Sequence, residues 1–179
     1  KLITCKNNGR QLVLKSPPNT ERIKLLLEMF PQAKFIYISR NPYHVFYSAC
    51  NLWQKAIRKF SLQDFTTDQM EEIIFNSYIH MMEQYEKDKA LIPPGNLAEI
   101  KFEDLESKPL TVLKEVYSVL NIPDFETAEP GFIRQLKKEK QYEKFKYNYD
   151  EEIFKKIDRK WSKYVHQWNE KRNEIYEYA

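Results

Sequence analysis

The chain has 179 residues, of which 42% are hydrophobic, so it is long enough for one globular domain and too short for two ordinary ones. No apolar run approaches the roughly 18 residues of a membrane span, and no signal-peptide pattern is present. Two cysteines form no ligand cluster, and we expect a reduced, cytoplasmic location. Positive charge gathers at the two ends, with 11 Lys and Arg against 2 Asp and Glu over residues 1–60, and 13 against 9 over residues 134–179. This pattern suits an anionic ligand, and equally charge complementarity within the fold.

The first predicted elements form a strand–helix–strand unit. Residues 12–14 are apolar and predict a short buried strand that ends at Lys15. A Ser-Pro-Pro break follows, and then a helix that Pro31 ends. The next element is a strand over residues 34–39, and because Phe35 to Ile38 are apolar on both faces, we expect it to be buried between layers of helices. Such a unit has parallel strands, so Lys15 and Arg40 should lie at the same edge of the sheet.

Arg40 follows the strand directly and precedes a helix that Asn41 caps and Pro42 opens. Free N–H groups and the helix dipole favour an anion there, and a guanidinium adds a fork for phosphate oxygens. Ser48, two helical turns later, offers a hydroxyl to the same anion. The alternative is a strand-end arginine that pairs with a surface carboxylate.

The middle of the chain predicts alternating helices and one more strand. Helices are expected over about 42–58 and 68–91, and the methionine and aromatic stripe of the second should pack in the core. A strand over 97–102 ends at Glu103 and Asp104, whose carboxylates could orient cations or cap the following loop, and capping is the favoured role. A helix over 109–121 follows.

The last part predicts a loop over 124–131, a helical turn over 132–138 and helices in the C-terminal third. Basic and aromatic residues alternate over 137–148, a pattern that suits stacking on a base or a solvated connector. The C-terminal helices carry a packing stripe of Ile153, Phe154, Ile157, Trp161, Tyr164 and Trp168.

Several common site motifs are absent from the sequence. Three glycines, at 9, 95 and 131, cannot form a glycine-rich phosphate loop, and three scattered histidines give no metal spacing. No serine–histidine–acid arrangement can be defended, and we expect no metal site.

Three landmarks in order carry a family resemblance. They are Leu-Lys-Ser-Pro-Pro-Asn-Thr at 14–20, Phe-Pro-Gln-Ala-Lys-Phe at 30–35 leading to Ser-Arg-Asn-Pro at 39–42, and Ile-Lys-Phe-Glu-Asp-Leu at 100–105. Together with Ser48, they resemble the sulfotransferase family, and more narrowly its bacterial and tyrosylprotein-type branch. The resemblance implies a parallel α/β sheet flanked by helices, of the P-loop-nucleotide-hydrolase type, with a helical C-terminal part. It also implies the donor 3′-phosphoadenosine 5′-phosphosulfate (PAPS), the product 3′-phosphoadenosine 5′-phosphate (PAP) and a hydroxyl acceptor.

The resemblance assigns roles residue by residue. Lys15 matches the catalytic lysine near the transferring sulfuryl group, and Arg40 with Ser48 matches the pair that binds the 3′-phosphate. Phe102 stands where the family usually has a tyrosine near the adenosine. Lys140 and Tyr142 fall in the late basic–aromatic stretch that closes over the nucleotide.

The chain departs from the family at two places. The family's 5′-phosphosulfate loop would lie upstream of Lys1, so we expect residues 1–179 to be a single domain that lacks its first strand, and to be inactive and poorly soluble alone. Many relatives have histidine where this chain has Asn19, and asparagine cannot accept a proton.

Two other functions remain open from the residues. A nucleotide kinase-like phosphotransferase would need an upstream Walker lysine and magnesium bound by Glu103 or Asp104. A non-catalytic module would bind anions or nucleic acid through the basic ends with a strong salt dependence. For the sulfotransferase hypothesis we expect no nucleic-acid partner, and carbohydrate, lipid, protein tyrosine and small alcohol all remain open as acceptors.

Overall fold

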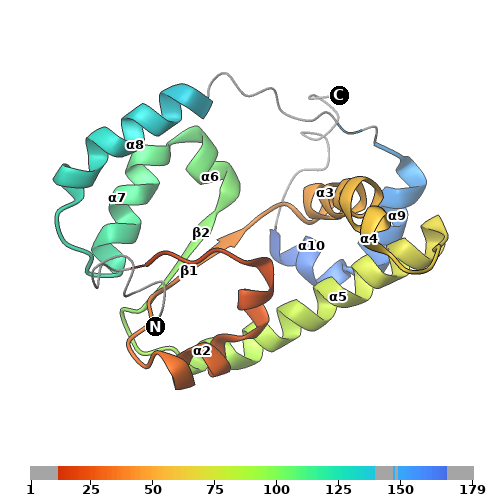
Figure 1. The fold of residues 1–179 in the computed structure, drawn as a ribbon, viewed down its shortest axis with the longest axis horizontal. Helices are drawn as coiled ribbons and strands as arrows, with labels where there is room; N and C mark the ends of the chain where they lie inside the picture. The colour runs from red at the N-terminus through yellow and green to blue at the C-terminus, as the bar shows by residue number, and fades with distance from the viewer. Residues whose placement is uncertain (1–11, 140–146, 148, 169–179) are drawn as a thin grey trace.

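A computed structural model of the chain describes residues 12–139, 147 and 149–168. Its centre is a sheet of two parallel strands, β1 (Phe35–Ser39) and β2 (Leu97–Lys101). The register pairs Phe35 with Leu97 and Ser39 with Lys101, so both strands end at the same edge. Helices flank this sheet on two sides (Figure 1), which confirms the expected α/β class with a parallel sheet.

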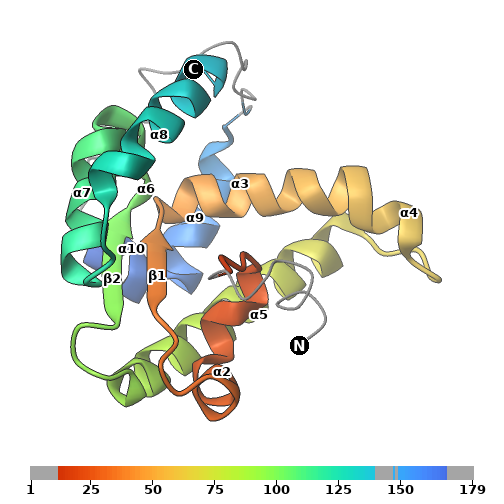
Figure 2. The ribbon, with the colours of Figure 1, turned by 60° about the vertical axis from the view of Figure 1, so that its left-hand side comes forward.

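The helical elements in chain order are η1 (Pro17–Glu21), α2 (Ile23–Met29), α3 (Pro42–Leu52), η2 (Trp53–Ile57), α4 (Arg58–Phe60), α5 (Thr67–Asp88), η3 (Lys89–Leu91), α6 (Phe102–Ser107), α7 (Pro109–Val119), α8 (Phe125–Glu139), α9 (Glu151–Lys160) and α10 (Ser162–Trp168). Elements α6, α7 and α8 lie on one side of the sheet, whereas α3, α5, α9 and α10 lie on the other (Figures 1 and 2).

The main core lies between the sheet, α3, α5 and the C-terminal helices. Phe46 stacks on Phe75 with ring centroids 4.6 Å apart, and Phe75 meets Trp161 edge-on at 5.2 Å. Trp161 is fully buried and donates a hydrogen bond from Nε1 to the carbonyl oxygen of Phe75 at 3.1 Å. The predicted packing roles of the α5 and C-terminal stripes are confirmed, except that Ile73 on α5 is exposed.

Both long helices that follow the first strand begin at residues suited to the position. The side-chain oxygen of Asn41 accepts a hydrogen bond from the Tyr43 N–H at 3.0 Å, and Pro42 opens α3 as predicted. Thr66 and Gln69 form a reciprocal capping box at the start of α5.

The two faces of β1 differ in their cover. Phe35, Tyr37 and Ser39 face the main core, whereas Ile36 and Ile38 on the opposite face are each 47% exposed. On that second face the buried packing lies over β2, where Ala98 meets Val116 and Leu120 in a small cluster. The prediction that both faces of this strand are buried is therefore wrong for the described residues.

The predicted strand over residues 12–14 is also wrong. Residues 12–16 have no regular structure, Val13 is 91% exposed, and the chain runs into the 3-10 helix η1. Within the described residues, the partner of β1 is β2 and not an earlier strand. Three apolar residues are too short a stretch to form a strand without a partner, and the two prolines that follow at 17 and 18 lack the backbone donors that would extend it.

The predicted loop over 124–131 is instead the first half of α8, which contains Pro130. A proline inside a helix removes one backbone hydrogen bond. Aromatic packing accounts for the continuation, because Tyr117 on α7 meets Phe125 at 5.1 Å and Phe132 at 6.1 Å. The helix is therefore stabilised on both sides of the proline by its contact with α7.

Candidate functional site

Arg40 lies at the carboxyl end of β1, immediately before α3. Its guanidinium carbon is 4.5 Å from the centre of the Phe102 ring, a cation–π distance. The strand register explains this contact, because Ser39 pairs with Lys101 and the next residue of each strand end therefore follows alongside. The Nε atom of Arg40 is buried and has no hydrogen-bond partner. A buried donor without a partner is rare in native proteins and calls for an explanation.

Glu103 fixes the turn that presents Arg40. Its Oε1 accepts a hydrogen bond from the backbone N–H of Asn41 at 3.2 Å, across from one strand end to the other. Its Oε2 is buried without a partner. Glu103 therefore caps the turn after β1, and not the loop after its own strand as the sequence predicted.

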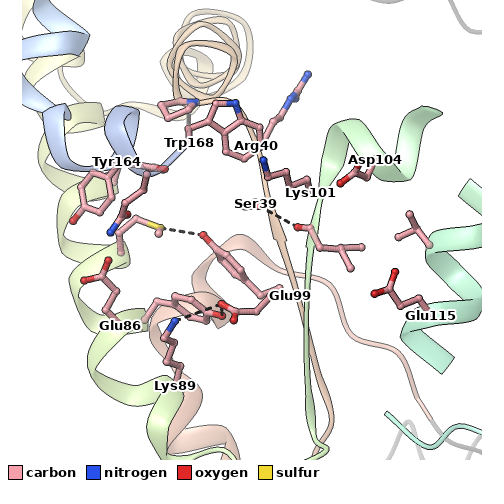
Figure 3. A pocket seen from close by; sticks show the side chains of 18 of the residues that line it. Ser39, Arg40, Glu86, Lys89, Glu99, Lys101, Asp104, Glu115, Tyr164 and Trp168 are labelled. Atoms are coloured by element: carbon pink, nitrogen blue, oxygen red, sulfur yellow. Dashed lines mark hydrogen bonds and ion pairs between the residues drawn. The ribbon is translucent and has the colours of Figure 1, made fainter. Parts of the chain in front are cut away.

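A cavity of about 510 Å³ opens at this edge of the sheet (Figure 3). It lies against the face that carries Tyr37 and extends beyond β2 to α6 and α7. The charged and aromatic residues that line it are Tyr37, Arg40, Tyr78, Tyr85, Glu86, Lys89, Glu99, Lys101, Asp104, Lys108, Glu115, Tyr164 and Trp168. Eight of these residues are charged, so the lining is more polar than that of a typical small-molecule site and suits a charged ligand better than an apolar one.

The two ends of the cavity have different chemistry. At one end Tyr37 and Tyr85 stack with centroids 4.1 Å apart, and the Tyr85 hydroxyl donates to Glu99 at 2.7 Å. At the other end, where the strands finish, the Lys101 ammonium lies 4.9 Å from the Trp168 ring centre. The Nε1 atom of Trp168 is buried there without a hydrogen-bond partner. The end near Arg40 therefore holds the unused donors.

Burial changes the titration of groups around the site. Burial, followed by the charge of Glu99, raises the pKa of Tyr37 to about 12, so this phenol stays protonated and remains a donor at neutral pH. Burial, followed by the nearby Arg40 cation, lowers the pKa of His44 below its ordinary value of 6.5. His44 is therefore neutral at pH 7, and a bound anion near Arg40 would oppose that shift.

The structure brings only some of the predicted site residues together. Arg40 and Phe102 touch, and Ser48 is half-buried on α3. Lys15 is exposed in the irregular segment before η1 and does not line the cavity that Arg40 lines. Lys140 and Tyr142 lie outside the described residues.

Sequence reasoning missed the roles of two residues at this site. Trp168 was predicted to be a packing residue, and its apolar spacing gives no signal that its N–H is left unpaired. Lys101 occupies the last position of β2 and lines the cavity. The alternation of side chains along a strand is the signal that could have placed it on this face.

No helix among the described residues is long and apolar enough to cross a bilayer. Within the same residues, His, Cys, Asp and Glu do not gather in groups of three or more that suit a metal ion.

Comparison with known proteins gives consistent results. A sequence model described as the sulfotransferase family matches residues 2–127. The omega-hydroxy-beta-dihydromenaquinone-9 sulfotransferases Stf3 of Mycobacterium bovis and Mycobacterium tuberculosis are each 31% identical over 156 residues, which cover 87% of this chain and 40% of theirs. An uncharacterized protein of Aquifex aeolicus is 29% identical over 114 residues, 63% of this chain and 14% of its own.

The chain therefore spans well under half the length of these relatives. No solved structure matches it significantly. The family match covers more than half of the chain and includes the β1–α3 turn, the Arg40–Phe102 contact and the Asn41–Glu103 hydrogen bond. This chain belongs to the sulfotransferase family.

Proposed function

We propose that the full-length protein transfers the sulfuryl group of PAPS to a hydroxyl acceptor, and that this chain holds the 3′-phosphate end of the donor. The observation that carries the proposal is the buried, unpartnered Nε of Arg40 at the carboxyl end of β1. In open α/β sheets ligands bind at that edge, and the α3 N-terminus favours an anion. A phosphate bound at this edge would pair with the Arg40 guanidinium, and a shift of that side chain away from its buried position would give Nε a phosphate oxygen as its partner.

The other nucleotide contacts in this proposal come from the family resemblance. Ser48 lies two turns into α3 and would donate its hydroxyl to the 3′-phosphate. Phe102 would contact the adenosine through its ring, without the hydroxyl that a tyrosine offers. Lys140 and Tyr142 would close over the nucleotide.

In the reaction, a new bond forms between the acceptor oxygen and sulfur while the bond from sulfur to the bridging phosphate oxygen breaks. The bridging oxygen keeps the electron pair, and the acceptor's proton passes to a base. Sulfuryl transfer resembles phosphoryl transfer in spreading charge onto oxygens, so preorganised cations accelerate it. Lys15 would neutralise the charge that develops on the bridging oxygen. The side-chain amide of Asn19 cannot serve as the base.

The acceptor class is a hydroxyl, on a carbohydrate, lipid, protein tyrosine or small alcohol. The relative Stf3 is named for a hydroxylated dihydromenaquinone. We extend to this chain only the hydroxyl, and we propose a cytoplasmic location and no nucleic-acid partner.

The proposal is tested by calorimetry on the full-length protein with PAP and with adenosine 5′-phosphate. Because a charge-assisted hydrogen bond contributes about 1.5–3 kcal/mol, Arg40→Ala should weaken PAP binding roughly 10- to 150-fold and adenosine 5′-phosphate binding far less. Arg58→Ala, which removes an exposed arginine on α4, is the matched control and should change neither affinity.

Equal losses for both nucleotides in Arg40→Ala would remove the 3′-phosphate assignment. Transfer of phosphate from ATP and magnesium, with no sulfate transfer from PAPS to a panel of the four acceptor classes, would replace the proposed reaction by a kinase-like one.

A further inference from the structure

The helical hairpin formed by α3, η2, α4 and α5 ends in a projecting turn. We call residues 58–65 the hairpin tip. Figure 2 shows α4 and the following turn extending away from the sheet and from the rest of the helices. The described chain runs without a break from α3 through the π-helical turn η2 into α4, so the tip stands at the far end of the helix that Arg40 precedes.

Two large apolar side chains at the tip face solvent. Phe60 is 83% exposed and Leu62 is fully exposed, with a single serine between them. Exposed apolar residues scattered singly are ordinary, and this pair differs from them in standing together on one projecting turn.

The exposure of these residues does not reflect a loose turn. Trp53 and Phe65 close the base of the tip with ring centroids 5.6 Å apart, and the Ser61 hydroxyl donates to the Ile57 carbonyl oxygen at 3.1 Å. These contacts hold the turn in place, and neither of them involves Phe60 or Leu62. Their apolar surface has no structural role in the described part of the chain.

Cations stand directly beside the apolar pair. Arg58 and Lys59 are exposed and immediately precede Phe60, and residues 29–63 contain no Asp or Glu. Asp64 lies within the tip itself and, with Asp68 and Glu72 on α5, lines the same surface hollow as Leu62. The positive charge of the tip therefore lies on the side of Arg58, Lys59 and Phe60, whereas the carboxylates lie on the side of Leu62.

This shape and chemistry fit a lipid surface better than a protein surface. A stable protein interface buries roughly 800 Å² on each partner, which a convex tip with two apolar side chains does not offer. A bilayer interface accepts small apolar insertions, and anionic headgroups attract neighbouring Lys and Arg. We propose that the hairpin tip docks on an anionic membrane surface, with Phe60 and Leu62 inserted among the lipids and Arg58 and Lys59 at the headgroups.

Docking and nucleotide binding should be separable. The helical path from Pro42 to Phe60 is about 28 Å long at 1.5 Å per residue, so changes at the tip lie far from Arg40. The affinity of the full-length protein for PAP should therefore be the same with and without a changed tip. Loss of PAP binding in Arg40→Ala would leave the docking proposal untouched, and loss of docking would leave the proposed sulfuryl transfer untouched.

The test is co-sedimentation of the full-length protein with vesicles of phosphatidylcholine alone or with roughly 30% phosphatidylglycerol. The double variant Phe60→Ser with Leu62→Ser should lower the partition coefficient at least about tenfold, because each side chain loses its apolar burial. The matched control is Leu91→Ser with Val119→Ser, which removes two exposed apolar side chains on other elements and should bind like the wild type.

Charge is tested separately by Arg58→Glu with Lys59→Glu. Each basic residue near an anionic surface is expected to change binding about fivefold, so this variant should lose affinity for phosphatidylglycerol vesicles much more than for phosphatidylcholine vesicles. Raising the salt concentration should likewise weaken binding of the wild type to phosphatidylglycerol vesicles more than to phosphatidylcholine vesicles.

Three results would overturn the proposal. The first is wild-type protein that does not sediment with anionic vesicles, or a tip variant that binds as well as the wild type. The second is a dimer, measured by light scattering, that the tip variant dissociates, since the occupant would then be a second copy. The third is a Leu62→Cys variant that a maleimide cannot label without vesicles, since the tip would then be covered by another part of the protein.

Discussion

Two apolar stretches of the chain each end at a cation, and they fold differently. Residues 35–39 form β1 and present Arg40 beside a capped helix, whereas residues 12–14 remain irregular and leave Lys15 exposed. Both stretches predict a buried strand when read locally. The difference shows that an apolar run becomes a strand when a partner and a well-formed turn are available.

Residues 35–39 pair along their whole length with β2. Two hydrogen bonds hold the turn that follows them: the Tyr43 N–H donates to the Asn41 side chain, and the Asn41 N–H donates to Glu103. No pairing of residues 12–14 with either strand exists in the described structure. Because Lys15 is proposed to act on the same ligand as Arg40, changes at the two regions can break or sharpen this contrast.

The largest effect is expected from Lys15→Ala in the full-length protein. If Lys15 stabilises charge that develops in the transition state, turnover with PAPS should fall about 100- to 1,000-fold while donor affinity changes little. Steady-state kinetics and calorimetry measure the two quantities. Lys24→Ala, an exposed lysine on α2, is the control. A collapse of affinity with normal turnover of bound donor would make Lys15 a ground-state anchor like Arg40.

The next effect concerns Glu103, which holds the turn before α3. Glu103→Ala leaves the Asn41 N–H without its partner and should lower the free energy of unfolding by about 1–3 kcal/mol. PAP affinity should fall with it, because Arg40 loses its fixed position. Glu103→Gln keeps a carbonyl acceptor and should retain most of the stability and most of the affinity for PAP. Urea unfolding and calorimetry provide the readouts, and a stable alanine variant with normal PAP affinity would contradict this role.

A smaller effect is expected at Ser48. Removing one neutral hydrogen bond to the ligand costs about 0.5–1.5 kcal/mol, so Ser48→Ala should weaken PAP binding about 2- to 12-fold. Binding of adenosine 5′-phosphate should not change. Ser61→Ala at the hairpin tip removes a serine hydroxyl remote from Arg40 and is the matched control. A loss shared by both nucleotides would argue against contact with the 3′-phosphate.

The smallest effect is a pH dependence from His44, whose pKa is lowered in the folded protein by burial and by Arg40. Below pH 6.5 the unfolded chain takes up a proton that folded His44 resists, so stability should fall as the pH drops through this range. His44→Gln should flatten the dependence. Urea midpoints at pH 7.5 and 5.5 measure it. A wild type and variant with equal pH slopes would show that His44 does not contribute.

The sequence predicted the elements whose signals are local and redundant. The β1 strand, the Asn41 cap of α3 and the long α5 helix are confirmed, as is the C-terminal stripe around Trp161. In each case periodicity, a cap or a turn residue pointed to the same structure. The sulfotransferase family, argued from three short landmarks, is confirmed by the family match.

The remainder depended on contacts between distant parts of the chain. The aromatic contacts of Tyr117 keep α8 helical through Pro130, although the local sequence favours a break. The Arg40–Phe102 contact follows from strand register, which the sequence does not specify until both partners are known. The unpaired Trp168 N–H depends on where α10 meets the sheet edge. The roles of Lys15 and Ser48 stay predictions.

The contact between Arg40 and Phe102 has a consequence for local opening of the sheet. The two residues extend the two strands of the described sheet, so a ligand bound at Arg40 as proposed would be held at the point where both strands end. Separating β1 from β2 would then also release the ligand, and the two equilibria are linked. Amide hydrogens of residues 35–39 and 97–101 should therefore exchange with deuterium more slowly when nucleotide is bound, which makes strand opening and ligand escape one event.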